Sequence, residues 1–262
     1  MPWAGNHKPN AHSMTCRSSS SARLAKDDGQ SFCAPTSPDA LLVSTPVTLR
    51  WQPVYAYIVT TIKSTSDYQL LQTGSAPNFA GGRITLCSCK HKDRATFQPS
   101  NDPQDPWKNV WVAGLTSISA DPSRSLAYLI CVERSFLSQR ELWQALPNDC
   151  RQAKCASNSE KGDLYRPRAA AANEPYRPAN YHRPMSGHVH SSHKHPNSWY
   201  HDVMQWGRRS RPPRLLLGQG LQSYRWTHVE MILKLNVIGH SAHHRLFPSF
   251  NNFISNLQQF EP

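Results

Sequence analysis

A compact run of arginines close to aromatic residues is the part of this sequence whose chemistry is easiest to name. Its members are Arg208, Arg209, Arg211 and Arg214. A guanidinium group binds a phosphate through paired hydrogen bonds, and an aromatic ring stacks on a base. We therefore expect these arginines to hold phosphates and Tyr224 and Trp226 to contact the substrate. The alternative is a solvated run of charge that binds polyanions weakly and in a salt-dependent way. Residue types alone leave both interpretations open.

Asp163 is the carboxylate that stands out, in a chain with 17 acidic residues against 29 Lys and Arg. It follows Gly162, and a Gly-Asp pair in a loop can present a carboxylate as a general base or as an acceptor for an exocyclic amine. An Asp that forms a turn is the simpler interpretation of the same pair. The sequence contains no Gly-x-Ser-x-Gly nucleophile motif and no glycine-rich phosphate loop. Whether the protein is an enzyme is therefore left open.

Cysteine and histidine clusters suggest a different class, a zinc-stabilised interaction protein. Cys87, Cys89 and His91 lie close together, and Cys150 and Cys155 complete a set of four only if the chain folds back. Structural zinc sites normally use Cys pairs two to four residues apart at a tight turn, and a pair with one residue between them in a strand has poor geometry. We therefore assign no metal ligand, we leave the cofactor open, and we interpret the histidine-rich stretch 182–201 as a solvated loop.

Charge and composition favour an anionic partner inside the cell. The formal net charge is +12, which attracts nucleic acid first and an anionic membrane surface second, although it can also serve solubility alone. Seven cysteines without regular disulfide spacing, and an N-terminus without an apolar signal region, favour a reducing compartment. No apolar run approaches the length of a membrane span. We expect an intracellular protein, cytoplasmic or associated with the nucleoid or nucleus, with nucleic acid or a nucleotide as its partner.

The elements that must position these residues are centred on stretch 110–145. Two apolar runs, 110–115 and 126–132, predict core strands joined by a turn. Residues 137–146 predict a helix, with Ser138 as N-cap and Glu141 three residues later in a capping-box pattern. Further strands are expected at 54–60, 84–89, 215–217, 224–226 and 231–235, with a turn at 218–220 and a short helix within 247–260. Residues 149–201 are expected to be irregular.

Three segments follow from this pattern. Residues 1–52 are rich in Ser, Thr, Pro and Ala and are expected to form a disordered tail, in which only the apolar run 40–43 has a reason to dock. Residues 53–235 are expected to form one α+β domain with a curved mixed β-sheet or small open barrel and a few helices. Residues 236–262 are expected to be a C-terminal extension with a short helix.

A series of short motifs occurs in a characteristic order along the chain. They are Tyr-Ala-Tyr-Ile-Val at 55–59, Ala-Pro-Asn-Phe at 76–79, Thr-Leu-Cys-Ser-Cys-Lys at 85–90 with Arg94, Trp-Val-Ala-Gly-Leu at 111–115, Leu-Ala-Tyr at 126–128, Gly-Asp-Leu-Tyr-Arg-Pro at 162–167, Ser-x-x-His at 192–195 and the late strand 215–226. This series resembles the nucleotide modification associated domains, most nearly the second type, found in bacterial and phage modification systems. The chain departs from that pattern where Lys108-Asn109 replaces an expected Gly-Asp, and where the loop from Tyr165 to His195 contains extra Ala, Pro and Arg.

The resemblance implies a role linked to modified nucleotides or bases in DNA, without a defined reaction. Carried onto this chain, it implies a pocket formed by Asn78, Lys90, Arg94, Tyr165 and Arg166. Asp163 or His195 would transfer the proton, and the arginine run would hold phosphates. We therefore expect a protein that binds or processes a modified base. The alternatives are a non-catalytic reader in which an aromatic ring stacks on a flipped base, and the zinc-stabilised interaction protein.

Overall fold

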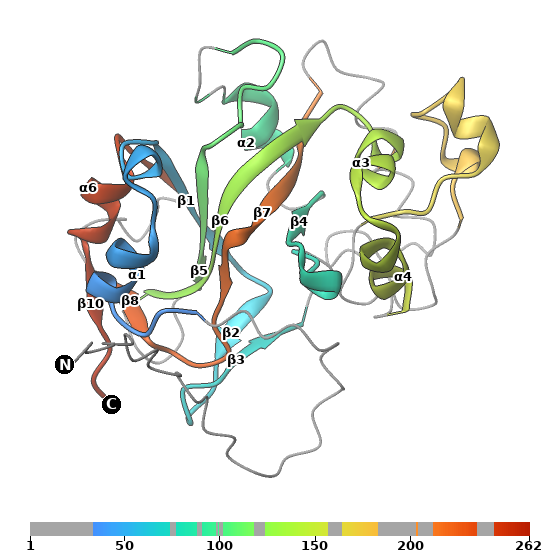
Figure 1. Ribbon diagram of the computed structural model, residues 1–262. Coiled ribbons are helices and arrows are strands. Elements are labelled where there is room, and N and C mark those ends of the chain that lie inside the picture. The colour runs from blue at the N-terminus through green and yellow to red at the C-terminus, as the bar shows by residue number, and fades with distance from the viewer. Residues whose placement is uncertain are drawn as a thin grey trace, which may run out of the picture.

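A curled, open, mixed sheet forms the centre of the computed structural model (Figure 1). The structure describes residues 34–73, 77–87, 91–97, 99, 102–117, 124–156, 164–182, 203, 212–234 and 244–262. Strand β1 (Val54–Val59) pairs in parallel with β5 (Trp111–Thr116), and β5 pairs antiparallel with β6 (Arg124–Phe136). The edge strand β9 (His244–Phe247) pairs antiparallel with β1. The α+β class and the curved mixed sheet predicted from the sequence are confirmed.

The long strand β6 has two different partners along its free edge. Its first residues pair with β8 (Met231–Leu233), and the remainder pairs with β7 (Leu215–Arg225). Beyond these, β10 (Leu257–Gln259) pairs with β8, and β4 (Thr85–Leu86) pairs with β7. A separate two-stranded ribbon joins β2 (Ile62–Ser64) to β3 (Leu70–Gln72). Because the partners diverge along β6, the sheet curls instead of lying flat.

Strands β1 and β5 are buried along their whole length, which explains why their sequences are continuous apolar runs. The ring of Tyr128 lies across Gly114, where a Cβ atom would collide with it. The Tyr128 and Tyr57 hydroxyl groups are hydrogen-bonded to each other in the buried interior. A glycine in β5 thus provides the space in which an aromatic ring from the next strand packs on the sheet.

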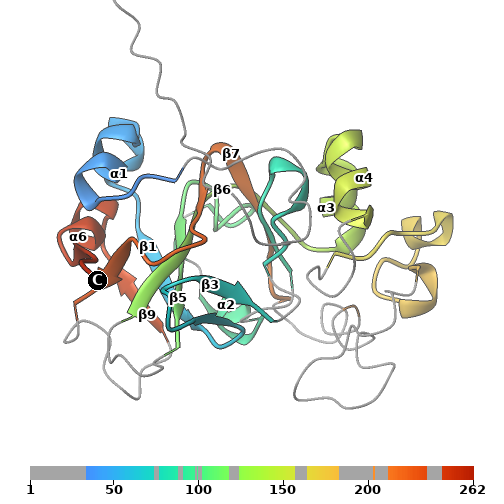
Figure 2. The ribbon, with the colours of Figure 1, turned by 90° about the horizontal axis from the view of Figure 1, so that it is seen from below.

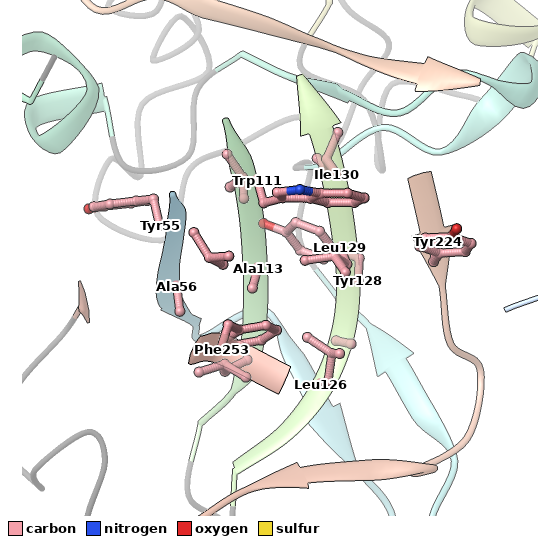
Figure 3. Packing of buried hydrophobic residues seen from close by; sticks show 14 of the residues in the cluster. Tyr55, Ala56, Trp111, Ala113, Leu126, Tyr128, Leu129, Ile130, Tyr224 and Phe253 are labelled. Atoms are coloured by element: carbon pink, nitrogen blue, oxygen red, sulfur yellow. The ribbon is translucent and has the colours of Figure 1, made fainter. Parts of the chain in front are cut away.

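One face of the sheet is covered by helices from both ends of the described chain. Helix α1 (Pro38–Ser44) and helix α6 (Phe250–Ile254) pack side by side on this face, and the Trp111 ring lies 4.6 Å from that of Phe250 between centroids. The aromatic and aliphatic side chains of this core project from neighbouring strands (Figure 3). Trp111 is fully buried, as expected of a core residue.

The expected boundary of the tail at residue 52 needs correction. Ser37 caps α1 by accepting a hydrogen bond from the Ala40 amide at 3.2 Å, and Leu41 is fully buried. A short 3₁₀ helix, η1 (Val47–Leu49), follows, and the Leu49 carbonyl accepts a hydrogen bond from Trp111 Nε1 at 3.0 Å. Residues 34–52 therefore belong to the fold, because they cover an apolar face that would otherwise be exposed. Residues 1–33 lie outside the described residues.

Two further expectations near the C-terminus are corrected. Strand β7 runs through residues 218–220, where we expected a turn, and its register against β6 shifts nearby instead. A Cβ on Gly218 would collide with the Ile130 side chain, so this glycine allows two strands to approach closely. The expected extension at 236–262 contributes β9 and β10 to the sheet, and its helix is limited to the five residues of α6.

Helices α3 (Gln139–Ala145) and α4 (Asn148–Ala156) lie beside β4 and β7, away from α1 and α6 (Figures 1 and 2). The Ser138 hydroxyl accepts a hydrogen bond from the Glu141 amide at 3.2 Å, and the Glu141 carboxylate accepts one from the Leu137 amide at 3.0 Å. The predicted helix and cap are thus confirmed. We expected irregular structure from residue 149, and α4 shows that this was wrong.

The remaining helices in the described ranges are short. They are α2 (His91–Thr96), η2 (Ala80–Gly82), η4 (Ala169–Ala172) and η5 (Pro178–Asn180). Within the described ranges, no helix has both the length and the apolar character needed to cross a membrane.

Candidate functional site

A cavity of about 400 Å³ lies beside α4. The described residues that line it are Trp143, Asn148, Arg151, Gln152 and Arg166. Trp143 comes from the last turn of α3, and Arg166 comes from the segment after α4. The other three lie at positions i, i+3 and i+4 of α4, which places them on one side of that helix. Three consecutive parts of the chain therefore converge on one opening.

Another part of the α4 surface, which carries Cys150 and Lys154, is fixed to the loop that precedes β4. The Lys154 ammonium group is buried and donates hydrogen bonds to three oxygens: the Asn78 carbonyl at 3.1 Å, Asn78 Oδ1 at 3.3 Å and the Arg83 carbonyl at 2.7 Å. A buried ammonium group is tolerated only where such acceptors replace its water. Lys154 therefore joins α4 to both ends of the loop 78–83.

Gly81 lies directly under α4, next to Cys150. Its φ of 72° is in the left-handed region, and a Cβ atom there would be 2.8 Å from Cys150 Cα and 2.9 Å from the Cys150 carbonyl oxygen. Both neighbours are backbone atoms, so a side chain could not be accommodated by a rotamer change. Only glycine allows α4 to approach this loop so closely, and the approach sets the position of the cavity-lining side of the helix.

The predicted substrate-binding residue Asn78 has a structural environment. Its backbone exchanges hydrogen bonds with Thr85 at 2.9 and 3.0 Å, and its Oδ1 accepts from the Ala80 amide at 3.0 Å as well as from Lys154. Only 2% of its surface is exposed. Asn78 thus shapes the loop that supports α4 and does not line the cavity.

The cavity side of α4 carries hydrogen-bonding groups that have no partner among the described residues. Arg151 Nε is buried and has no hydrogen-bond partner among the described residues. Neither Arg151 nor Arg166 forms an ion pair with a carboxylate in the described part of the chain. The side chains of Trp143, Asn148 and Gln152 also make no hydrogen bond within the described ranges. The cavity therefore presents two guanidinium groups, two amides and one indole, a set that suits an anion with polar and aromatic parts.

The electrostatics of α4 argue against thiol chemistry. Burial is the main cause that raises the pKa of the Cys150 thiol. The positive charge of Lys154 lowers this pKa, the negative charge of Asp149 raises it, and the positive charge of Arg83 lowers it. The group is therefore a neutral thiol at physiological pH and not an activated thiolate.

Two predicted pocket residues lie near each other in the sequence but have different environments. Tyr165 is buried with Ala171, Tyr181 and Val203, and its amide donates to Gln139 Oε1 at 3.3 Å. Its neighbour Arg166 is exposed and lines the cavity. The structure therefore places Arg166 at the cavity, whereas Tyr165 anchors the segment.

The predicted residue Arg94 is located elsewhere. It lies on α2, is buried, and donates a hydrogen bond from its guanidinium group to the Cys87 carbonyl. This contact joins α2 to the end of β4, so the arginine stabilises the fold and does not line the cavity.

The expected aromatic contacts at the end of β7 face the core. The Tyr224 hydroxyl lies 3.3 Å from Ser44 Oγ, and Trp226 Nε1 donates to the Pro35 carbonyl at 2.8 Å. Both rings are buried beneath the N-terminal segment, and burial raises the pKa of Tyr224. Their role is to bind residues 34–44 to the sheet, and the structure does not bring them to the cavity.

Of the predicted phosphate-binding arginines, only Arg214 lies within the described residues. Its Nη2 donates to the Pro103 carbonyl at 3.3 Å, away from the cavity. The other predicted site residues, Lys90, Asp163, His195, Arg208, Arg209 and Arg211, lie outside the described residues.

Among the residues that the structure describes, no group of three His, Cys, Asp or Glu side chains converges to hold a metal ion. Cys89 and the histidines at 188–195 lie outside those residues.

Four of the residues that line the cavity were not predicted from the sequence: Trp143, Asn148, Arg151 and Gln152. The available signal was the spacing of the last three at i, i+3 and i+4 after Pro147, which places polar side chains on one side of a helix. It was not used because residues from 149 were expected to be irregular.

Comparisons with protein-family models, with curated proteins and with solved structures found no match to this chain.

Proposed function

We propose that this chain binds a nucleotide, either free or within a nucleic acid, through the cavity beside α4. The single observation that carries the proposal is that Arg151 and Arg166 line one cavity while neither is neutralised by a carboxylate in the described part of the chain. Guanidinium groups bind phosphate oxygens bidentately, and an unneutralised pair favours a ligand with more than one negative charge.

Three other features support the same ligand class. Trp143 gives the cavity an aromatic surface next to the two arginines, as stacking sites for bases have. The net charge of +12 favours approach of polyanions. The order of short motifs along the chain resembles the nucleotide modification associated domains, which implies modified bases as the target.

The test is calorimetric titration of the full chain with deoxynucleoside monophosphates. Arg151→Gln and Arg166→Gln each remove one phosphate contact, so we expect roughly tenfold weaker binding for each. Arg177→Gln is the matched control, because Arg177 lies in the same segment as Arg166 but forms an exposed ion pair with Glu174 outside the cavity. Equal affinity in all four proteins would show that the cavity is not the binding site.

Processing of the bound base is a separate part of the proposal and rests on Asp163. This residue lies three positions before the cavity-lining Arg166 in the sequence. If Asp163 acts as the base, Asp163→Asn abolishes turnover of a modified nucleotide while binding persists. Unchanged turnover in Asp163→Asn would remove that role. Binding without turnover in the unmodified chain would favour a reader.

A further inference from the structure

We infer that α4 reads a single unpaired base in the cavity, with the Trp143 ring against the face of the base and the Asn148 and Gln152 amides along its hydrogen-bonding edge. The inference rests on the proposed function, because it assumes that the phosphate of the ligand lies against Arg151 and Arg166. Beyond the proposed function, it specifies that the base is recognised and that this base must be unpaired.

The side chains that line the cavity differ in the hydrogen-bonding groups that they offer. An arginine offers only donors, whereas an amide offers both an acceptor and two donors. The edge of a base presents donors and acceptors next to each other, as adenine does with its N6 amine and N7. Asn148 and Gln152 are the lining residues that can satisfy both kinds of group at once.

Both amides are available. Neither makes a hydrogen bond within the described residues, and they are one helical turn apart on the same side of α4. Arg151 lies between them in the sequence and also lines the cavity. An anionic group and a polar edge of one ligand can therefore be bound by neighbouring positions of one helix.

The size and shape of the site bear on which ligands fit. A cavity of about 400 Å³ falls within the range of small-ligand sites and receives an isolated group. A base within a duplex is stacked on both sides and pairs through its edge, so its face is not accessible to Trp143. Free nucleotides, single strands and extruded bases therefore fit, and a fully paired duplex does not.

Fixing α4 from its other side makes this reading position stable. Lys154 and the close approach of Gly81 hold the helix against the loop 78–83. The amides therefore project from a supported element, which reduces the entropy lost when they bind a ligand.

The experiment compares deoxyadenosine monophosphate with deoxyribose 5-phosphate, which lacks the base, by calorimetry of the full chain. We expect the nucleotide to bind at least tenfold more tightly. Trp143→Leu and the double variant Asn148→Ala with Gln152→Ala should reduce that ratio to near one, because they remove contacts to the base and leave both arginines in place. Gln144→Ala is the control, since Gln144 is an exposed amide on α3 that does not line the cavity.

The possible results distinguish failure of the proposed nucleotide binding from failure of base recognition. If neither compound binds, the proposed function fails. If both bind equally in the unmodified chain, phosphate binding stands and base reading is overturned. A second measurement compares a single-stranded oligonucleotide with the same strand in a duplex at one salt concentration. Tighter binding of the single strand supports the inference, and equal or weaker binding overturns it. Circular dichroism confirms that each variant is folded.

Discussion

The two sides of α4 differ in how far the protein uses their polar groups. On the side of Lys154, the donors are matched by carbonyl and amide oxygens of the loop 78–83, and Gly81 brings the backbones into contact. On the side of Asn148, Arg151 and Gln152, the described residues supply no such partners. The hydrogen-bonding groups on one side of α4 are paired within the protein and hold the helix in place, whereas those on the other side are available to a ligand. Changes on the first side should therefore affect stability, and changes on the second should affect binding.

Gly81→Ala should have the largest effect, because it places a methyl group against the Cys150 backbone at a positive φ. We expect the free energy of unfolding to fall by about 3 kcal/mol, measured by denaturant titration. Gly220→Ala is the control, since its nearest neighbour would be the Arg83 side chain at 3.6 Å. Equal stability of the two variants would show that α4 does not depend on this close approach.

Lys154→Met should be the next most damaging change. It keeps the aliphatic part of the side chain but leaves the Asn78 and Arg83 oxygens without their ammonium donor. We expect a loss of about 2 kcal/mol in the free energy of unfolding. Lys234→Met serves as the comparison, because Lys234 is exposed and donates only to the Ser255 carbonyl at 2.9 Å. A loss no greater than that of Lys234→Met would contradict the supporting role.

Arg151→Gln should leave stability unchanged within about 0.5 kcal/mol, since the side chain forms no ion pair in the described chain. Binding of a single-stranded oligonucleotide should instead become less sensitive to salt. We expect the slope of log K against log salt concentration to decrease by about 1. An unchanged slope, measured by fluorescence anisotropy, would mean that Arg151 contacts no phosphate.

The last prediction concerns the pH dependence of stability in the segment that carries Arg166, an effect confined to alkaline pH. Tyr181 donates a hydrogen bond to the Pro175 carbonyl at 2.5 Å, and burial raises the pKa of its phenol to about 12. The unfolded chain ionises at a lower pH than the folded chain. The contribution of the protonated Tyr181 phenol to the stability of the fold is therefore complete below about pH 10. It is lost as the pH rises from about 10 to about 12.

The corresponding measurement is the free energy of unfolding across that pH range, compared with Tyr181→Phe. The variant should lose less stability as the pH rises, because it has no phenol to ionise at this position. Parallel curves for the two proteins would show that Tyr181 does not contribute to the pH dependence.

The elements of the central sheet were predictable from the sequence because their signals are local. The apolar runs that become β1 and β5 are continuous, and the Ser138 cap with Glu141 marks the start of α3. Residues 218–220 were mistaken for a turn because glycines are common both in turns and where strands approach closely. Only the position of Ile130 on the neighbouring strand distinguishes these cases.

The candidate site was harder to predict because its residues acquire their roles from tertiary contacts. Asn78 resembled a binding residue, but Lys154, 76 positions later in the chain, occupies its side chain. Tyr224 and Trp226 had the composition of a stacking surface, yet residues 34–44 cover them. The sequence pointed to Arg166, which lines the cavity, but not to Arg151, because the helix that carries Arg151 was missed. Residue type indicates which groups bind anions, and burial by distant segments determines which remain available.

The covering of the aromatic face by α1 and α6 has a consequence for the order of folding. Trp111 and α1 lack one of their packing partners until residues 250–254 have been synthesised, more than 200 residues after α1. During translation this surface stays apolar and open, and such surfaces recruit chaperones or associate with one another. The pairing of β9 with β1 adds another contact between distant parts of the chain. Closure of this core is therefore expected to follow the synthesis of residues 244–254.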